Sequence, residues 1–233
     1  MGRFSIQLLV LLGFPHLVCS QVSGHIPEPQ QVNFKSTDFY NVLQWQKGSH
    51  YSNNAVYIVQ YKMYGERQWN NKTECWKIRR TYCDLTQETK HFMEPHFARV
   101  QAQTANGQSN WVMSERIIPF WETAVGPPRI KLIPQARSIL VKLLIPRTPF
   151  RSKNGSWITL DKLYNDVEYL IEISSNLVDN RSELYTATGI TLNIRNLKPK
   201  TTYCVRAQIK IPIFSKVSEY GGKKCVTTFQ DIQ

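Results

Sequence analysis

The chain is built from short β-prone runs that form two sets, one on each side of the sequence Gly126-Pro127-Pro128. Within runs such as 41–46 and 56–63, polar and apolar residues alternate with period two, and Val, Ile, Tyr and Trp are frequent. Both features are typical of half-buried strands. Gly-Pro-Pro is the strongest interruption in the chain, and each set of six or seven runs fills about 100 residues, which fits one β-sandwich. The sequence therefore predicts an all-β protein of two tandem sandwiches.

The domain limits follow from these runs. We place the first domain at residues 21–122, a linker at 123–128 and the second domain at 129–233. Residues 160–165 are expected to form a short helical turn. With 42% hydrophobic and 12% aromatic residues, the chain has enough apolar material for two packed cores, which excludes disordered, collagen-like and coiled-coil proteins. The expected strands are 32–34, 41–46, 56–63, 81–85, 97–102 and 111–113, then 129–133, 139–145, 167–173, 190–194, 203–207 and 225–228.

Residues 1–20 have the pattern of a secretory signal peptide. A basic residue, Arg3, precedes an apolar run over 6–18, and small or medium residues precede a cut near Ser20. A membrane anchor is the alternative, but the run falls short of the ~20 apolar residues that span a bilayer, and Pro15 interrupts it. No later stretch is long and apolar enough to span, and the C-terminal residues lack a lipid-anchor signal. We therefore expect a secreted, extracellular product without a membrane span.

Removal of this peptide leaves four cysteines: Cys75, Cys83, Cys204 and Cys225. An even number in a secreted chain indicates disulfides, and four cysteines allow three connectivities. Local pairing would give each half its own bridge, worth about 2.6 and about 3.4 kcal/mol in the chain-entropy model. Zinc binding is the alternative, but neither pair has the required spacing and no histidine stands at ligand distance in the sequence. We expect no metal and no cofactor.

Three Asn-X-Ser/Thr sequons begin at Asn71, Asn154 and Asn180. Behind a signal peptide, they are predicted glycosylation sites on exposed segments.

Motifs of the common enzyme classes are absent. The sequence contains no Gly-x-Ser-x-Gly, no Gly-x-Gly-x-x-Gly and no phosphate-binding loop. His91 and His96 are not at a recognised catalytic spacing, and the acidic residues are scattered. We therefore predict that the protein is not an enzyme.

The net charge of +12 belongs mainly to the second half. Residues 21–122 carry a net charge of +2, whereas residues 123–233 carry +9. Such a surface attracts anionic partners. Secretion argues against a nucleic acid and makes heparan sulfate or an acidic protein surface a candidate partner. A basic face that serves only solubility is the alternative.

The segment Leu197-Lys-Pro199-Lys-Thr201-Thr-Tyr203 resembles the corner of fibronectin type III domains, in which a tyrosine hydroxyl bonds back to the backbone. A loop followed by an ordinary strand is the alternative. In the first half, Met93-Glu-Pro95-His96-Phe97 occupies the equivalent place without the Thr and Tyr. The first domain is therefore expected to close its corner differently.

Several further stretches resemble the ectodomains of class II cytokine receptors, which consist of two fibronectin type III-like domains. Class I receptors would carry Trp-Ser-x-Trp-Ser late in the second domain, and residues 214–220 contain no Trp. The resemblance covers essentially the whole mature chain, is stronger in the first domain, and implies the two local disulfides. It is carried by Asn41-Val-Leu-Gln-Trp45-Gln, by residues 56–69, by Cys83-Asp-Leu-Thr86, by Ser109-Asn-Trp111 and by Trp121-Glu-Thr123.

The resemblance implies binding of an interleukin-10-family helical cytokine. Residues 57–69 are most similar to soluble members of the family, which implies a decoy that keeps interleukin-22 from membrane receptors. Two alternatives stay open. The chain could be the ectodomain of a signalling class II receptor, or a matrix or adhesion module that binds glycosaminoglycan.

The resemblance also implies which residues contact the cytokine. The main contact loop matches Tyr64, Gly65, Glu66 and Arg67, with Tyr64 as the anchor, since a tyrosine presents a large rigid surface at low entropic cost. The alternative for Tyr64 is an aromatic side chain packed on its own domain. Further contacts are implied in 86–91, 105–109, 148–153 and 211–218, and specifically at Thr86, Gln87, Asn106 and Gly107.

Overall fold

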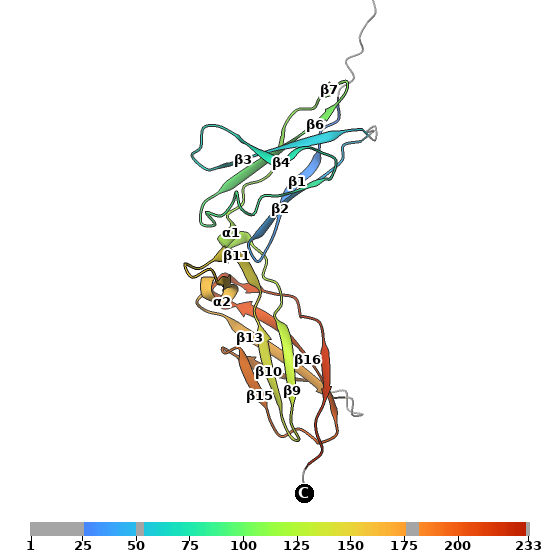
Figure 1. The fold of residues 1–233 in the computed structure, drawn as a ribbon, viewed down its shortest axis with the longest axis vertical. Helices are drawn as coiled ribbons and strands as arrows, with labels where there is room; N and C mark the ends of the chain where they lie inside the picture. The colour runs from blue at the N-terminus through green and yellow to red at the C-terminus, as the bar shows by residue number, and fades with distance from the viewer. Residues whose placement is uncertain (1–25, 50–53, 176–181, 232–233) are drawn as a thin grey trace, which may run out of the picture.

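The computed structural model describes residues 26–49, 54–175 and 182–231. Two β-sandwiches follow one another along the long axis of the molecule (Figure 1). The predicted all-β architecture of two tandem fibronectin type III-like domains is confirmed. The predicted signal peptide and the sequon at Asn180 lie outside the described residues.

The first domain has two antiparallel sheets around one core. One sheet has the order β1 (Gln30–Thr37), β2 (Tyr40–Gln46) and β5 (Tyr82–Asp84). The other has the order β4 (Asn70–Ile78), β3 (Val56–Met63), β6 (His96–Thr104) and β7 (Gly107–Gln108), and β8 (Val112–Met113) also pairs with β6. The core is filled by inward-facing residues of both sheets, among them Leu43, Trp45, Tyr57, Val59 and Val100.

The second domain repeats this arrangement. One sheet has the order β15 (Thr191–Ile194), β10 (Ile139–Leu144) and β9 (Arg129–Pro134). The other has the order β14 (Ser182–Ala187), β13 (Glu168–Ser175), β16 (Thr202–Ile211) and β17 (Lys216–Val217), and β18 (Lys224–Thr227) also pairs with β16. Between β10 and β13, the hairpin of β11 (Arg147–Arg151) and β12 (Trp157–Thr159) leads into the short helix α2 (Leu160–Leu163), which lies in the predicted helical turn.

The predicted runs omit the short strands β7, β11, β12 and β17, and they also omit the two longer edge strands β4 and β14. Their side chains are mostly exposed, and only Cys75 of β4 is buried. A strand without a buried face lacks the apolar alternation from which the other strands were predicted.

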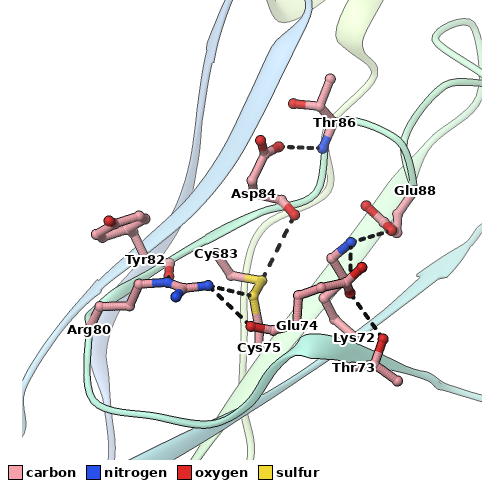
Figure 2. The surroundings of a disulfide bond; sticks show 10 residues. All are labelled: Lys72, Thr73, Glu74, Cys75, Arg80, Tyr82, Cys83, Asp84, Thr86 and Glu88. Carbon is pink, nitrogen blue, oxygen red and sulfur yellow. Dashed lines mark hydrogen bonds and ion pairs between the residues drawn. A yellow bond between two sulfur atoms is a disulfide. The ribbon is translucent and has the colours of Figure 1, made fainter.

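Each domain has its own disulfide. Cys75–Cys83 joins β4 to β5, that is, one sheet of the first domain to the other (Figure 2). Cys204–Cys225 joins the neighbouring strands β16 and β18 of the second domain. These are the two local pairs.

Aromatic rings from both domains form a shared cluster where the domains meet. Phe39, in the β1–β2 turn, is fully buried in the core of the second domain, where its ring packs against Phe92, Phe150 and Tyr164. The Tyr164 hydroxyl donates a 2.7 Å hydrogen bond to the carbonyl oxygen of Phe120 in helix α1 (Pro119–Glu122). The two cores are therefore joined by directional contacts and not merely by a flexible tether.

The linker after α1 lies against the β1–β2 turn. The Asp38 carboxylate accepts a 2.7 Å hydrogen bond from the Gly126 amide, and the Asp38 amide donates to Ala124. A Cβ at position 126 would lie 2.5 Å from an Asp38 carboxylate oxygen, so a larger residue there would displace the Asp38 side chain. Burial raises the pKa of Asp38, although its bond to Gly126 opposes the shift.

Candidate functional site

Four large apolar side chains near the junction of the domains are more than half exposed. Tyr64 is 70% exposed, Met93 52%, Trp121 54% and Ile213 71%. Tyr64 follows β3, Met93 lies in the β5–β6 connection, Trp121 is in α1, and Ile213 is in the 3₁₀ turn η1 (Pro212–Phe214) after β16. We call these four residues the junction face.

The β3–β4 loop holds Tyr64 by backbone and carboxylate hydrogen bonds. The Tyr64 amide donates to the Pro95 carbonyl at 2.8 Å. Gly65 has φ of +87°, a conformation that favours glycine, and no atom would lie within 4 Å of an added Cβ. The Glu66 carboxylate accepts from the Met63 amide at 2.9 Å and from the Asn70 side chain at 3.1 Å. Glu66 therefore closes the loop, while Tyr64 and Arg67 project from it.

The other segments of the junction face are joined in the same way. The Phe120 amide donates to the Phe92 carbonyl at 2.9 Å, which ties α1 to the β5–β6 connection. The Lys216 ammonium donates to the carbonyl oxygens of Trp121 and Thr123 at 2.8 and 2.7 Å, and burial lowers the pKa of Lys216. The four exposed side chains are therefore carried by segments that contact one another in series.

The chemistry of the junction face is that of a protein-binding surface. Aromatic residues and methionine are enriched at the centres of protein interfaces, and groups of exposed apolar residues mark such sites. Among the described residues, no group of His, Cys, Asp and Glu side chains could hold a metal ion.

Thr86 and Gln87 differ in their surroundings. Thr86 is buried, and its hydroxyl accepts a 3.0 Å hydrogen bond from the Asn41 amide. Gln87 is exposed and lines a groove of about 360 Å³ whose other walls include Tyr40 of the first domain and Trp157 of the second. Thr86 therefore holds the backbone in place, and Gln87 is the more accessible of the two.

An ion-pair cluster forms part of this groove. The Lys72 ammonium lies 2.6 Å from a Glu88 carboxylate oxygen and 3.1 Å from one of Glu74 (Figure 2). Burial disfavours the charged form of Lys72, but the two carboxylates together outweigh this effect and raise its pKa.

Asn106 and Gly107 lie at the other end of the first domain. Strand β6 pairs with β3 so that His96 is opposite Met63, next to Tyr64, whereas Thr104 at the far end of β6 pairs with Gly107. At 3.3 Å per residue, the eight steps along β6 correspond to about 26 Å. Figure 1 shows β7 at the end of the domain away from α1. The structure does not bring these two residues together with Tyr64.

Sequence reasoning missed Met93 and Trp121, whereas Ile213 falls in the expected segment 211–218. Both missed residues are large apolar side chains followed by a glutamate, in segments without strand periodicity. A large apolar residue in such a segment was the feature of the sequence that could have identified them.

Two predicted glycosylation sites are described. Asn71 is exposed on β4, and Asn154 is exposed in the β11–β12 hairpin. Both side chains make hydrogen bonds, Asn71 with Gln60 and Asn154 with Ser156. In the part of the chain that the structure describes, no helix is long and apolar enough to cross a membrane.

Both halves of the chain match protein-family models. Residues 5–111 match the model described as tissue factor. Residues 123–229 match the model described as interferon-alpha/beta receptor, fibronectin type III.

Individual relatives agree with these models. Interleukin-22 receptor subunit alpha-2 of Rattus norvegicus is 36% identical over 200 residues, covering 85% of this chain and 87% of the relative. Interleukin-20 receptor subunit alpha of Homo sapiens is 35% identical over 228 residues, covering 96% of this chain and 41% of the relative. The solved chicken interferon gamma receptor alpha chain has the same fold, with a TM-score of 0.61, 22% identity, and coverage of 88% of this chain and 99% of that one. The chain belongs to the class II cytokine receptor family, which is a receptor family and not an enzyme family.

Proposed function

We propose that the protein is a secreted receptor that binds an interleukin-10-family helical cytokine through the junction face. We further propose that the ligand is interleukin-22 and that binding keeps it from membrane receptors. The observation that carries the proposal is the set of four exposed apolar side chains on connecting segments of both domains, two on loops, one in α1 and one in η1. The similarity to interleukin-22 receptor subunit alpha-2 over 85% of the chain supports the choice of ligand.

The rigidity of the junction supports high affinity. A surface that is already ordered before binding loses less conformational entropy when the ligand arrives. Tyr64 is held through its own amide, and Trp121 is held by the Lys216 bond to its carbonyl oxygen. The aromatic cluster beneath fixes the domains that carry them.

The first experiment is surface binding of the purified mature chain to a panel of interleukin-10-family cytokines that includes interleukin-22. Selective binding of interleukin-22, together with loss of its signalling on receptor-bearing cells, is the expected result. Selective binding of another member would keep the receptor proposal and replace the ligand. Binding of interleukin-22 without loss of signalling would indicate a carrier and contradict the decoy role.

Replacement of the central side chain tests the site. We expect Tyr64→Ala to weaken cytokine binding by at least about 2 kcal/mol, or about 30-fold, without changing the melting temperature, because Tyr64 is exposed. Tyr82→Ala is the matched control, since Tyr82 is also more than half exposed but lies on β5, outside the junction face. Equal binding by the Tyr64 variant and the control would refute the proposed site.

One alternative has an observation in its favour. Interleukin-20 receptor subunit alpha matches 96% of this chain over only 41% of its own length, so the chain could correspond to the ectodomain of a longer receptor. A transcript that continues after Gln233 into an apolar segment of about 20 residues would favour this alternative.

Asn71 and Asn154 are the described positions at which we propose glycans. Asn71 follows the β3–β4 loop, so a glycan there would limit how a cytokine approaches Tyr64. Thr73→Ala removes that sequon. A lower mass and unchanged or faster association are expected, and an unchanged mass would show that Asn71 carries no glycan.

A further inference from the structure

The outer face of the β15-β10-β9 sheet carries cations on neighbouring strands. Lys131 of β9 stands directly opposite Lys142 of β10, and both are exposed. Arg129 lies two residues before Lys131 and therefore on the same face, opposite Leu144. On this face, the partner of Lys142 on β15 is Thr191, which carries no charge.

Further cations lie beside this sheet. Strand β18 packs next to β9 and begins with Lys224, preceded by Lys223. A Cβ on Gly221 would lie 2.8 Å from the Pro128 carbonyl oxygen, so the chain leading to β18 runs close to the start of β9. We call the set Arg129, Lys131, Lys142, Lys223 and Lys224 the cationic face.

No carboxylate neutralises these side chains. Strands β9, β10, β15 and β18 contain no Asp or Glu. Among the ion pairs within the described ranges, none includes a residue of the cationic face. The five charges are therefore available to an external anion.

Strands β13 and β16 of the other sheet are organised in the opposite way. There Lys210 stands opposite Glu168, and Arg206 stands opposite Glu172. The Arg206 guanidinium donates to the Glu172 carboxylate at 2.9 and 2.7 Å. Between β13 and β16, both cations stand opposite a carboxylate, whereas β9 and β10 place two lysines opposite each other, an arrangement that destabilises a sheet.

From this contrast we infer that the cationic face binds a sulfated polysaccharide of the heparan sulfate type. A row of sulfate groups would neutralise the opposed Lys131 and Lys142 and the neighbouring Arg129. Binding would then relieve the repulsion that the free domain retains. This partner is bound on the second domain and is independent of the junction face.

The composition of the cationic face favours a polysaccharide over a protein or a membrane. Lysine is depleted at protein interfaces, whereas aromatic anchors are enriched, and this face has no aromatic side chain on β9, β10 or β15. The exposed large apolar side chains at these strands are Leu144, 49% exposed on β10, and Ile190, 51% exposed directly before β15. A membrane-inserting face would need a more extensive apolar surface.

The test is binding to immobilised heparin as a function of salt concentration. We compare the wild-type chain with the double variant Lys131→Gln/Lys142→Gln. The control is Lys35→Gln/Lys47→Gln, which removes the same charge from exposed positions of the first domain. Desulfated heparin, a DNA duplex and phosphatidylserine vesicles serve as the other probes.

We expect the Lys131/Lys142 variant to bind heparin at least about 10-fold more weakly at about 0.15 M salt. The slope of log affinity against log salt should fall by about two, because two cation contacts are lost. The control should change affinity by less than about 2-fold. Cytokine binding should be the same in all three proteins, which separates this test from that of the junction face. The Lys131/Lys142 variant should melt no lower than the wild-type chain, because it removes two like charges that stand opposite each other.

Four results would overturn the proposal. They are no binding of the wild-type chain to heparin at this salt concentration, equal weakening by both variants, undiminished binding to desulfated heparin, and tighter binding to the vesicles or the DNA duplex than to heparin.

Discussion

The two domains share one topology but close the same corner with different residues. In the second domain, the Tyr203 hydroxyl accepts a 2.9 Å hydrogen bond from the Lys198 amide, five residues earlier, so the predicted tyrosine corner is confirmed. In the first domain, Nε2 of the buried His96 lies 3.0 Å from the His91 carbonyl oxygen, also five residues earlier. A carbonyl oxygen only accepts, so Nε2 carries the hydrogen and donates. The corner requires a bond back to the backbone, and its direction and its residue type are free to vary.

A second position repeats this theme. Arg99 of β6 lies between the rings of Trp69 and Trp111, with 4.4 Å from its guanidinium carbon to each centroid. Arg206 of β16 lies over the ring of Tyr220 at 4.3 Å and also forms an ion pair with Glu172 on the same sheet. In each domain an arginine on the central strand holds the outer surface together, by two aromatic rings in one and by one ring and a carboxylate in the other.

The largest expected effect tests whether the two domains can be compared as separate units, because it concerns a residue of one domain that is buried in the core of the other. Phe39 belongs to the first domain but is buried in the core of the second. We expect Phe39→Ala to lower the free energy of unfolding of the second domain by about 3–5 kcal/mol, the usual cost of deleting a buried phenyl ring. Differential scanning calorimetry measures this loss. Phe229→Ala, at an exposed position of the second domain, is the control. A loss confined to the first domain would show that the cores are separate.

The next largest effect measures how much the tyrosine corner stabilises the second domain relative to the first. Tyr203→Phe leaves the Lys198 amide without its acceptor, and we expect the second domain to lose about 1–2 kcal/mol while the first is unchanged. Urea unfolding followed by domain-resolved hydrogen exchange measures the two separately. Tyr185→Phe removes a hydroxyl that bonds to the exposed Glu183 and should cost less than about 0.5 kcal/mol. Equal costs for the two variants would mean that the corner bond has no special value.

The difference in residue type also predicts a difference in pH dependence. Burial lowers the pKa of His96, although its bond to His91 and the charges of Glu66 and Glu94 oppose the shift. The unfolded chain therefore binds the proton at higher pH than the folded domain does. The stabilisation is complete above the unfolded pKa of about 6.5 and is lost as the pH falls below it.

Melting curves between pH 7.5 and 5 test this prediction. The first domain should lose stability as the pH falls. His96→Gln keeps an N–H donor that does not titrate, so it should flatten the pH dependence of the first domain. An unchanged slope in this variant would assign the effect to another group.

Much of this comparison could be predicted from the sequence, but only for features whose residues all lie within one continuous segment. Period-two runs predicted the central strands, and the spacing from Leu197 to Tyr203 predicted one corner. His96 could not be predicted as the equivalent of Tyr203, because its role depends on burial and on the backbone position of His91. The aromatic cluster shared by the two domains could not be predicted either. Its members Phe39, Phe120 and Phe214 come from a turn, a short helix and a 3₁₀ turn, none of which has a periodic sequence pattern.

The candidate site shows the same limit. The β3–β4 loop could be singled out because its four residues are consecutive, and Tyr64 is indeed exposed. Thr86 and Asn106 were selected by their loops alone, and the sequence did not indicate that the first is buried or that the second lies at the other end of β6. Which loops meet at one end of a sandwich depends on strand direction along the whole domain.

The smallest expected effect concerns the two arginines. Lysine keeps the charge but loses the planar group that stacks on aromatic rings. We expect Arg99→Lys to cost the first domain about 1–2 kcal/mol, because two ring contacts and the bonds from Arg99 to Gln60 are lost. Arg206→Lys should cost the second domain about 0.5–1 kcal/mol, since one ring is involved and a lysine can still pair with the partly exposed Glu172. Chemical denaturation of both variants, with Arg67→Lys as an exposed control, measures the difference. If Arg206→Lys proved the more costly, the carboxylate and not the second aromatic ring would be the stronger partner, and the two domains would differ in what stabilises their outer surfaces as well as in their corners.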